Sequence, residues 1–333
     1  MGDPTFQSRA LPAPQPEPLT ESAFRAANLC VVGNLNRDLK TSPLRVREQL
    51  FEDGETSAEA LVETIGGGGA NSACAAAALG ARVAFLGKIG ADGLGDRLER
   101  ALRAHGVAPR LARDPGVATG SSIGLAFDHG RRHFISCLPN NEALRFEDLD
   151  LSVLAHFDHL YRADLWFSRP MLFGGNQRLF QAARALGRAI SIDLNWDPRW
   201  SVADAEEIRA RKAAVREVLP LVDLAHGNAR ELREFTGAPD LDQALARLAD
   251  WGVPAVVAHL GAAGAGYYRE GKLLVEPPVP AARHINTTGT GDVLSVCLML
   301  LHGRAEPREA LRLANRVVSE FIEGRRQFLP SLP

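Results

Sequence analysis

The stretch Asn286-Thr287-Thr288-Gly289-Thr290-Gly291-Asp292 leads directly into an apolar segment, Val293 to Leu301, which has the composition of a buried helix. Glycines just before a helix leave its first amides unpaired, and these amides and the helix dipole favour a bound anion. A carboxylate beside an anion site is explained if Asp292 accepts a proton from a nucleophile that attacks a bound phosphoryl group. The alternative is a helix cap, worth about 0.5–2 kcal/mol.

A second glycine-rich stretch, Gly66-Gly67-Gly68-Gly69-Ala70-Asn71, leads into the Ala-rich segment Asn71 to Leu79, which we expect to be helical. Four glycines lose much conformational entropy on folding, so we expect that the backbone passes very close to another group there. A flexible hinge is the alternative interpretation.

The rest of the chain alternates short apolar runs with amphipathic segments. The runs Leu29 to Gly33, Val83 to Leu86, Tyr161 to Phe167, Ala189 to Leu194 and Ala255 to His259 are typical of buried strands. Helical spacing separates them, which predicts an α/β fold with a mainly parallel sheet covered on both faces. Two segments, about 41–63 and 119–138, break this alternation and predict a small β appendage.

Composition limits the possible partners. Of 333 residues, 46% are apolar and 23% charged, as in a folded protein, and 38 basic against 40 acidic residues give a net charge of -2. We therefore expect no nucleic-acid or membrane partner. Five prolines in the first twenty residues predict a disordered tail over 1–27. The four cysteines form no Cys-x-x-Cys pair, which indicates free thiols and a cytoplasmic location.

Three common motifs are excluded by their context. No G-x-G-x-x-G follows the first strand, so a Rossmann dinucleotide site is disfavoured, and no Walker A sequence is present. The stretch from Gly120 to Gly124 fits the letters of a hydrolase nucleophile elbow, but alternating Ile123, Leu125 and Phe127 indicate a strand where the elbow needs a helix.

From about residue 29 to the C-terminus, the chain resembles the ribokinase-like (pfkB-type) carbohydrate kinases. Five motifs carry the resemblance in the expected order. They are Asn36-x-Asp38, the segments 66–71 and 87–95, Asn228-Ala229-Arg230-Glu231, Leu260-Gly261-Ala262-Ala263-Gly264, and Asn286 to Asp292.

The resemblance implies a three-layer sandwich with a mainly parallel central sheet and a small β-sheet lid. The kinase domain would span 28–333, with lid segments at about 39–65 and 119–138, and the lid would mediate a homodimer. The implied activity is ATP-dependent transfer of the γ-phosphoryl group to a hydroxyl of a sugar or sugar-like substrate, with Mg²⁺ as cofactor.

The resemblance also implies roles for individual residues. Asp292 would be the general base, beside Gly289, Thr290 and Gly291, whose amides would stabilise the phosphoryl group. The acceptor would contact Asn36, Asp38, Gly67, Gly68, Asn71, Ser168 and Arg169. The nucleotide side would include Asp193, Asn228, Glu231, Gly261, Gly264 and Asn315. Glu231 would hold Mg²⁺ through water.

Three questions stay open at this level. The family usually has Asp where Asn286 stands, at a position linked to a monovalent-cation site, so K⁺ is an open possibility. Ser168 replaces a Glu that contacts ribose in ribokinases, which argues against ribose, and Arg169, Arg131 or Arg132 could meet an anionic substrate. The alternative interpretation of Arg131 and Arg132, which we favour for these two, is surface arginines with no such role. The alternatives to a sugar kinase are a nucleoside kinase on the same fold and a catalytically silent sugar-binding regulator.

Overall fold

The computed structural model describes residues 19–45, 53–128, 131–285, 289–328 and 332. Most of the expected tail, part of the first lid segment and Asn286 lie outside these residues.

A nine-stranded sheet forms the centre of the molecule, with the strand order β13-β12-β11-β10-β9-β8-β1-β4-β5. All neighbours are parallel except at β11–β12 and β12–β13, which are antiparallel. The strands are β1 Asn28–Val32, β4 Arg82–Gly90, β5 Val107–Asp114, β8 His159–Arg162, β9 Ala189–Asp193, β10 Leu224–Asn228, β11 Ala255–His259, β12 Ala265–Arg269 and β13 Lys272–Glu276.

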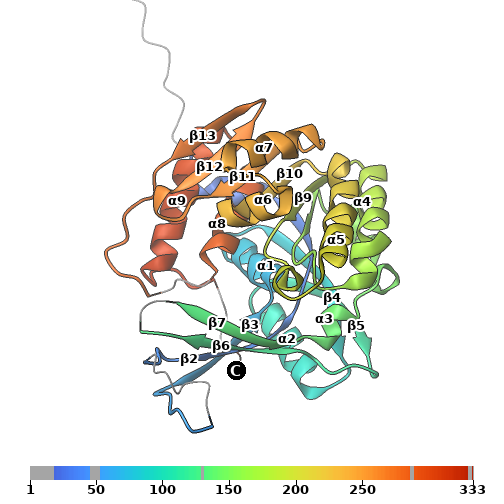
Figure 1. The fold of residues 1–333 in the computed structure, drawn as a ribbon, viewed down its shortest axis with the longest axis vertical. Coiled ribbons are helices and arrows are strands. Elements are labelled where there is room, and N and C mark those ends of the chain that lie inside the picture. Colours follow the sequence, from blue (N-terminus) through green and yellow to red (C-terminus); the bar gives the residue numbers. More distant parts are fainter. Residues whose placement is uncertain (1–18, 46–52, 129–130, 286–288, 329–331, 333) are drawn as a thin grey trace, which may run out of the picture.

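Helices cover both faces of this sheet (Figure 1). Strand β1 shows why, because Leu29 and Val31 belong to one hydrophobic core cluster while Cys30 and Val32 belong to the other. One face carries α1 Gly68–Ala78, α2 Gly93–Ala104, α8 Thr290–Leu301 and α9 Pro307–Ile322. The opposite face carries α4 Asn176–Ala185, α5 Ala205–Val218, α6 Ala229–Thr236 and α7 Leu241–Asp250. The predicted three-layer α/β sandwich is confirmed.

Short helical segments connect these elements. They are η1 Glu21–Ala26, α3 Pro139–Glu142, η3 Phe146–Asp148, η4 Leu151–His156, η5 Met171–Gly175, η6 Pro198–Ser201, η7 Leu219–Leu221 and η8 Gly261–Ala263. In the described part of the chain, no helix combines the length and apolar character that crossing a bilayer requires.

A second, four-stranded sheet, here called the lid, lies at one end of the main body (Figure 1). Its strand order is β3-β2-β6-β7. The β2–β3 and β6–β7 pairs are antiparallel and the β2–β6 pair is parallel, so the lid is a mixed sheet. The strands are β2 Asn36–Thr41, β3 Leu61–Gly66, β6 Ser121–Ala126 and β7 Arg132–Cys137. This sheet accounts for the two segments that break the βα alternation.

Asn140 and Asp92 hold the lid to the body. Asn140 is fully buried, accepts a hydrogen bond from the Gly120 amide (2.8 Å), and donates to the carbonyl of Leu35. Asp92 caps α2 by accepting from the Gly95 amide (2.8 Å) and also accepts from the Thr119 amide (2.7 Å). Both connections therefore fix the chain just before lid strand β6.

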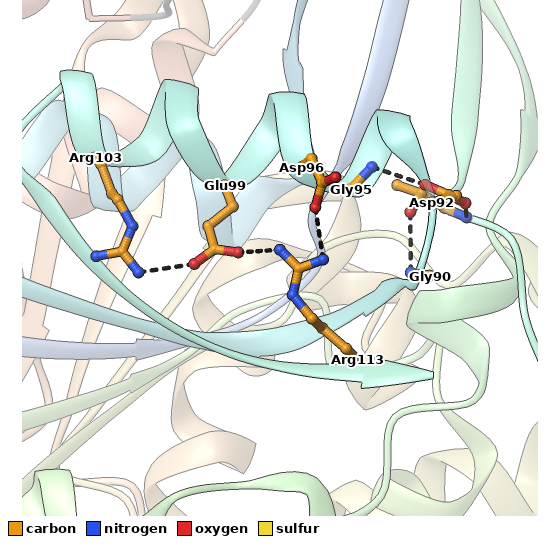
Figure 2. A network of polar contacts seen from close by, with 8 residues as sticks. Gly90, Asp92, Gly95, Asp96, Glu99, Arg103 and Arg113 are labelled. Carbon is orange, nitrogen blue, oxygen red and sulfur yellow. Dashed lines mark hydrogen bonds and ion pairs between the residues drawn. The ribbon is translucent and has the colours of Figure 1, made fainter. Parts of the chain in front are cut away.

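Figure 2 shows how the polar network continues along α2 from this cap. Arg113 on β5 pairs with Asp96 (2.6 Å) and with Glu99, which also binds Arg103. These ion pairs are at least partly exposed and contribute little stability each, about 0–1 kcal/mol. Asp92, which belongs to the glycine-rich segment 87–95, thus stabilises the start of α2 and its connection to the lid.

The structure differs from the sequence analysis in three places. Phe24, within η1, is fully buried in the core, so packing begins upstream of the expected boundary at residue 28. Helix α1 begins at Gly68, inside the glycine run. Strand β5 was not predicted, because its exposed residues include Arg110 and Arg113, which interrupt any apolar run.

Candidate active site

The carboxyl ends of the parallel strands and the N-termini of α1 and α8 meet at the end of the sheet that faces the lid. Two predicted site residues come together there, because Asn71 Nδ2 in α1 donates a hydrogen bond to Asp292 Oδ2 in α8 (3.3 Å). These residues are 221 positions apart in sequence. Helices α1 and α8 pack side by side, and this packing makes the contact possible.

Burial raises the pKa of the Asp292 carboxyl to about 7, and the negative charge of Asp164 adds to this effect. The hydrogen bond from Asn71 and the charge of Lys40 act in the opposite direction. A carboxyl that titrates near neutral pH is suited to accept a proton from a hydroxyl during a reaction.

The start of α8 has the geometry of an anion site. Gly289 adopts φ 82°, in the left-handed region that favours glycine, and helix α8 begins at Thr290. The N-cap residue is Gly289 itself, which has no side chain that could bind the first amides of the helix. His259 packs against this turn, because its Nδ1 lies 3.3 Å from the position that a Cβ on Gly291 would take. Its Nε2 is paired with Ser295 Oγ (2.9 Å).

Close backbone approach explains the glycines before α1. Gly67 adopts φ 96°, and a Cβ there would lie 2.3 Å from the Asn34 carbonyl oxygen. A Cβ on Gly66 would lie 2.0 Å from Asp38 Oδ1. Both positions exclude any side chain, which supports close approach over the hinge interpretation.

Asp164, a residue that the sequence analysis missed, holds this glycine segment in place. Its Oδ2 accepts from the amides of Asn34 (2.8 Å) and Gly69 (2.8 Å), and its Oδ1 accepts from the Gly68 amide (3.2 Å). The residue has φ 55°, which is uncommon outside glycine. The sequence analysis placed Asp164 inside the predicted strand Tyr161 to Phe167, whereas β8 ends at Arg162 and Asp164 lies in the turn after it.

Asp38 and Asn36 lie side by side on lid strand β2, as their spacing of two predicts for one face of a strand. Asn36 Nδ2 donates to Asp38 Oδ1 (2.8 Å), and Lys40 Nζ lies 3.8 Å from Asp38 Oδ2. Burial raises the pKa of Asp38 to about 6, although Lys40 and Asn36 partly counteract it. Lys40 was not among the predicted site residues.

Two buried polar atoms near these carboxyls have no hydrogen-bond partner within the described residues. They are Asn71 Oδ1 and Thr64 Oγ1. Thr64 is directly opposite Asp38 in the β2–β3 pair. A buried polar group without a partner costs free energy, about 1–3 kcal/mol, so both atoms are suited to bind hydroxyl groups of a ligand. Thr64 was also missed.

A second group of carboxyls lies at the ends of β9 and β10. Burial is the main cause that raises the pKa of Asp193, and the charges of Glu231 and Asp292 add to it. Glu231 and Asn228 form a capping box on α6, in which Asn228 Oδ1 accepts from the Glu231 amide (3.0 Å) and Glu231 Oε2 accepts from the Asn228 amide (2.8 Å). Glu231 therefore has a structural role in addition to any role in binding.

The predicted nucleotide-side residues Gly264 and Asn315 meet at Glu276. A Cβ on Gly264, where φ is 95°, would lie 2.1 Å from the Glu276 carbonyl oxygen. Asn315 Nδ2 donates to the carbonyls of Glu276 (3.2 Å) and Pro277 (2.8 Å). Gly261, with φ 58°, starts the turn that contains Gly264.

Ser168 and Arg169 make contacts within the fold. The Ser168 hydroxyl donates to the Leu144 carbonyl (2.5 Å) and accepts from the Met171 amide (3.1 Å). The exposed Arg169 lies over the Phe173 ring, 4.8 Å from its centroid. Their assignment to the acceptor stays a prediction, and Asn286 lies outside the described residues.

The described residues contain no group of three or more His, Cys, Asp or Glu side chains that could hold a metal ion directly. The donor set at the strand ends nevertheless fits a hard cation held partly by water. Asp193 is buried and Glu231 partly buried, and the negative charge of Glu231 raises the pKa of Asp193. Carboxylate oxygens and water are the ligands that Mg²⁺ prefers.

Comparison with known proteins places this chain in a family. The family model described as pfkB family carbohydrate kinase matches residues 26–325. The chain is 25% identical to a protein named ribokinase from Arabidopsis thaliana, over 97% of this chain and 83% of that protein.

Solved structures with the same fold include the ribokinase of Arabidopsis thaliana complexed with ribose and ATP. It has a TM-score of 0.72 and 23% identity, over 91% of this chain and 94% of that one. The adenosine kinase of Sinorhizobium meliloti has a TM-score of 0.73 and 21% identity, over 89% and 94%. At these identities the structures show a common fold.

Proposed function

The chain belongs to the pfkB family of carbohydrate kinases and is an ATP-dependent carbohydrate kinase, and from this premise we propose that Asp292 is its general base. The substrate hydroxyl would lose its proton to Asp292 as its oxygen attacks the γ-phosphorus of ATP, and ADP would leave. The observation that carries this proposal is the place of the Asp292 carboxyl in the first turn of α8, where it accepts a hydrogen bond from Asn71 (3.3 Å) and where burial raises its pKa to about 7.

The acceptor would lie between the lid and the glycine segment. Asp38 accepts hydrogen bonds from neighbouring hydroxyls, and Asn36 keeps the Asp38 carboxylate oriented. Asn71 Oδ1 and Thr64 Oγ1 gain partners when hydroxyl groups bind. Asp164 acts indirectly by fixing the backbone of Gly68 and Gly69.

The phosphoryl group would be held by amides from Gly289 to Asp292, which are aimed at charge that develops during transfer. The adenine side would be formed near Gly261, Gly264 and Asn315. Asp193, Asn228 and Glu231 would hold Mg²⁺, partly through water. Mg²⁺ bound with ATP neutralises phosphate charge during the transfer.

A nucleoside kinase is the second candidate. One observation favours it, because Phe134 on the lid lines the cavity beside Lys40 and an exposed aromatic ring can stack on a base. The adenosine kinase with the same fold is consistent with this alternative. A silent sugar-binding regulator is disfavoured, because a binder has no need of Asp292.

An ADP-release assay with ATP and Mg²⁺ tests these candidates directly. Sugars, sugar acids, sugar phosphates and nucleosides are compared as acceptors, and the product is identified by mass. We expect ADP release that depends on a sugar-like acceptor. Release that depends only on nucleosides supports the second candidate, and acceptor binding without ADP release from any compound supports the regulator.

The proposal includes a cytoplasmic location and a homodimer formed through the lid. All four cysteines are free and three of them, Cys30, Cys74 and Cys297, are buried, which suits a reducing compartment. Activation by K⁺ stays an open prediction, and measuring the same activity in KCl and in a tetramethylammonium salt tests it.

A further inference from the structure

A cavity of about 1000 Å³ lies between the lid and the C-terminal part of the body. Lid residues Lys40, Val62, Thr64 and Phe134 line one side of it. Ile285, Phe321, Gly324 and Phe328 line the other side. Because Lys40 and Thr64 both neighbour Asp38, the cavity continues from the proposed hydroxyl-binding position.

Strand register arranges the lid face that borders this cavity in rows. The first row is Thr64, Asp38 and Ser122, which are opposite one another in adjacent strands and all buried. The second row, two residues further along β2, is Val62, Lys40, Gly124 and Phe134. The third row contains Ala126 and Arg132.

The chemistry changes from one row to the next. The first row offers a carboxylate and two hydroxyls, which suit the hydroxyl groups of a sugar. The second and third rows offer Lys40 and Arg132. Two residues along a strand span about 6.6 Å, which separates the first row from the second and is close to the distance between a hydroxyl and a terminal group of a five- or six-carbon acceptor. Arg132, in the third row, is about twice as far along the strands from the first row.

The described residues that line the cavity carry an excess of positive charge. Lys40, Arg131 and Arg132 line it together with one carboxylate, Asp128. His284 lines it as well. Asp38 offsets part of the charge of Lys40 at 3.8 Å, but it is also the residue that would bind acceptor hydroxyls.

The electrostatics of Lys40 are consistent with an anion at this position. Burial lowers the pKa of Lys40, and the nearby charge of Arg132 lowers it further, whereas Asp38 and Asp292 raise it. A bound anion between Lys40 and Arg132 would offset this repulsion and favour both charged forms.

We propose that the acceptor of this kinase carries an anionic group, a carboxylate or a phosphate, that binds between Lys40 and Arg132 while its hydroxyls bind Asp38. This inference deepens the proposed function and depends on it for the identity of the acceptor site. Phe134, in the same row as Lys40 and two residues from Arg132 on β7, would contact the carbon chain of the acceptor.

Binding without chemistry tests the inference first. Five- and six-carbon sugars are each titrated calorimetrically as the neutral sugar, the corresponding aldonic acid and the terminal phosphate ester, at 50 and 500 mM NaCl. We expect at least one anionic form to bind tenfold or more tightly than its neutral sugar, and high salt to reduce this preference. The better of the acid and the ester identifies the anionic group.

Lys40→Met and Arg132→Gln then test the two cations. Loss of a charge-assisted hydrogen bond costs on the order of 1.5–3 kcal/mol, so the affinity for the anionic form should fall roughly ten- to 150-fold. The preference over the neutral sugar should fall by the same factor. Lys272→Met, an exposed lysine on β13 that does not line the cavity, is the matched control and should change neither. Thermal melting of each variant confirms that it is folded.

The two proposals fail in different ways. The anionic-acceptor inference is overturned if neutral sugars bind as tightly as their anionic forms, if no anionic form binds, or if both cation variants retain the preference. The kinase mechanism is overturned if an anionic acceptor binds with the expected preference but no phosphorylated product forms with ATP and Mg²⁺.

Discussion

Asp292 is placed where ionisation is unfavourable, although the first turn of a helix usually stabilises a carboxylate. Its pKa of about 7 reflects burial and the charge of Asp164, which outweigh the hydrogen bond from Asn71. A carboxyl group that only capped α8 would be stabilised in its ionised form. A carboxyl whose surroundings disfavour its ionised form is typical of residues selected for chemistry.

We expect Asp292→Asn to lower turnover by roughly 10²–10⁴-fold, because it removes the base while keeping the size of the side chain. ATP and acceptor affinities should change little. The wild-type rate should rise with pH through about 7, as the carboxyl loses its proton. Steady-state kinetics from pH 5.5 to 9 measure both effects, and a variant that keeps more than a tenth of wild-type turnover would contradict the role.

The same substitution should raise the stability of the folded chain, whereas replacing a residue with only a structural role would lower it. The pKa of Asp292 is higher in the folded chain than its ordinary value of 3.8, so its contribution to stability is lost as pH rises from about 4 to 7. Asp292→Asn should therefore raise the melting temperature at pH 8 more than at pH 4. Differential scanning calorimetry at both values measures this difference.

Asp38→Ala should weaken acceptor binding roughly ten- to 150-fold and leave ATP binding nearly unchanged, because a charged hydrogen-bond partner is worth about 1.5–3 kcal/mol. Since burial raises the pKa of Asp38 to about 6, wild-type acceptor affinity should also fall as pH drops through this value. Calorimetry with each ligand separately decides the matter. Equal weakening of both ligands, or of neither, would rule out the assignment.

At the scale of elements, two local connections shape the site. Asp164, after β8, joins the turn that follows β1 to the start of α1. The capping box of Asn228 and Glu231 joins the end of β10 to α6. Each connection fixes a strand end relative to a helix N-terminus, so the backbone groups of both are held at a fixed position.

We expect Asp164→Asn to lower stability by about 1–3 kcal/mol, because one amide-binding oxygen is replaced by a donor group that faces backbone N–H groups. The glycine segment should lose its fixed position, so the KM for the acceptor should rise more than the KM for ATP. Urea unfolding and steady-state kinetics measure these effects. An equal rise of both KM values would indicate a general loss of structure.

Glu231→Gln should raise the Mg²⁺ concentration needed for half-maximal activity, because the amide keeps an acceptor for the Asn228 amide but loses the charge. Acceptor affinity should stay the same. The matched control is Glu206→Gln, which changes a first-turn carboxylate of α5. An unchanged Mg²⁺ titration with reduced thermal stability would assign Glu231 to the capping box alone.

At the scale of the whole molecule, the lid has two different faces. Asp38, Thr64 and Ser122 face the body and are buried. On the opposite face, Ile123 and Ile135 are neighbours in register, with 41% and 54% of their surfaces exposed. Isolated exposed apolar residues are common, but neighbouring ones on one sheet face indicate a contact surface.

We expect Ile135→Lys to dissociate the proposed homodimer, because it places a charge in the apolar part of that surface. Light scattering coupled to size-exclusion chromatography measures the mass before and after the change. Val202→Lys, at a residue that follows η6 outside the lid strands and has 73% of its surface exposed, is the control. A wild-type monomer, or a dimer that survives the Ile135 change, would exclude assembly through this face.

The sequence by itself determined the α/β sandwich, because period-2 and helical patterns are local and each element carries its own pattern. It also singled out Asp292 and Asp38 as candidate site residues, because the glycines and short spacings near them are local signals. Both are consistent with the geometry of the site.

Only the tertiary structure identified Asp164, Thr64 and Lys40. Asp164 serves amides 95 to 130 positions away in sequence. Thr64 becomes a candidate site residue because strand pairing places it opposite Asp38, and Lys40 because the strand conformation of β2 puts it on the same face as Asp38. The charge, burial and free hydrogen-bonding atoms of a residue depend on neighbours that only folding brings near, so no local pattern in the sequence could contain them.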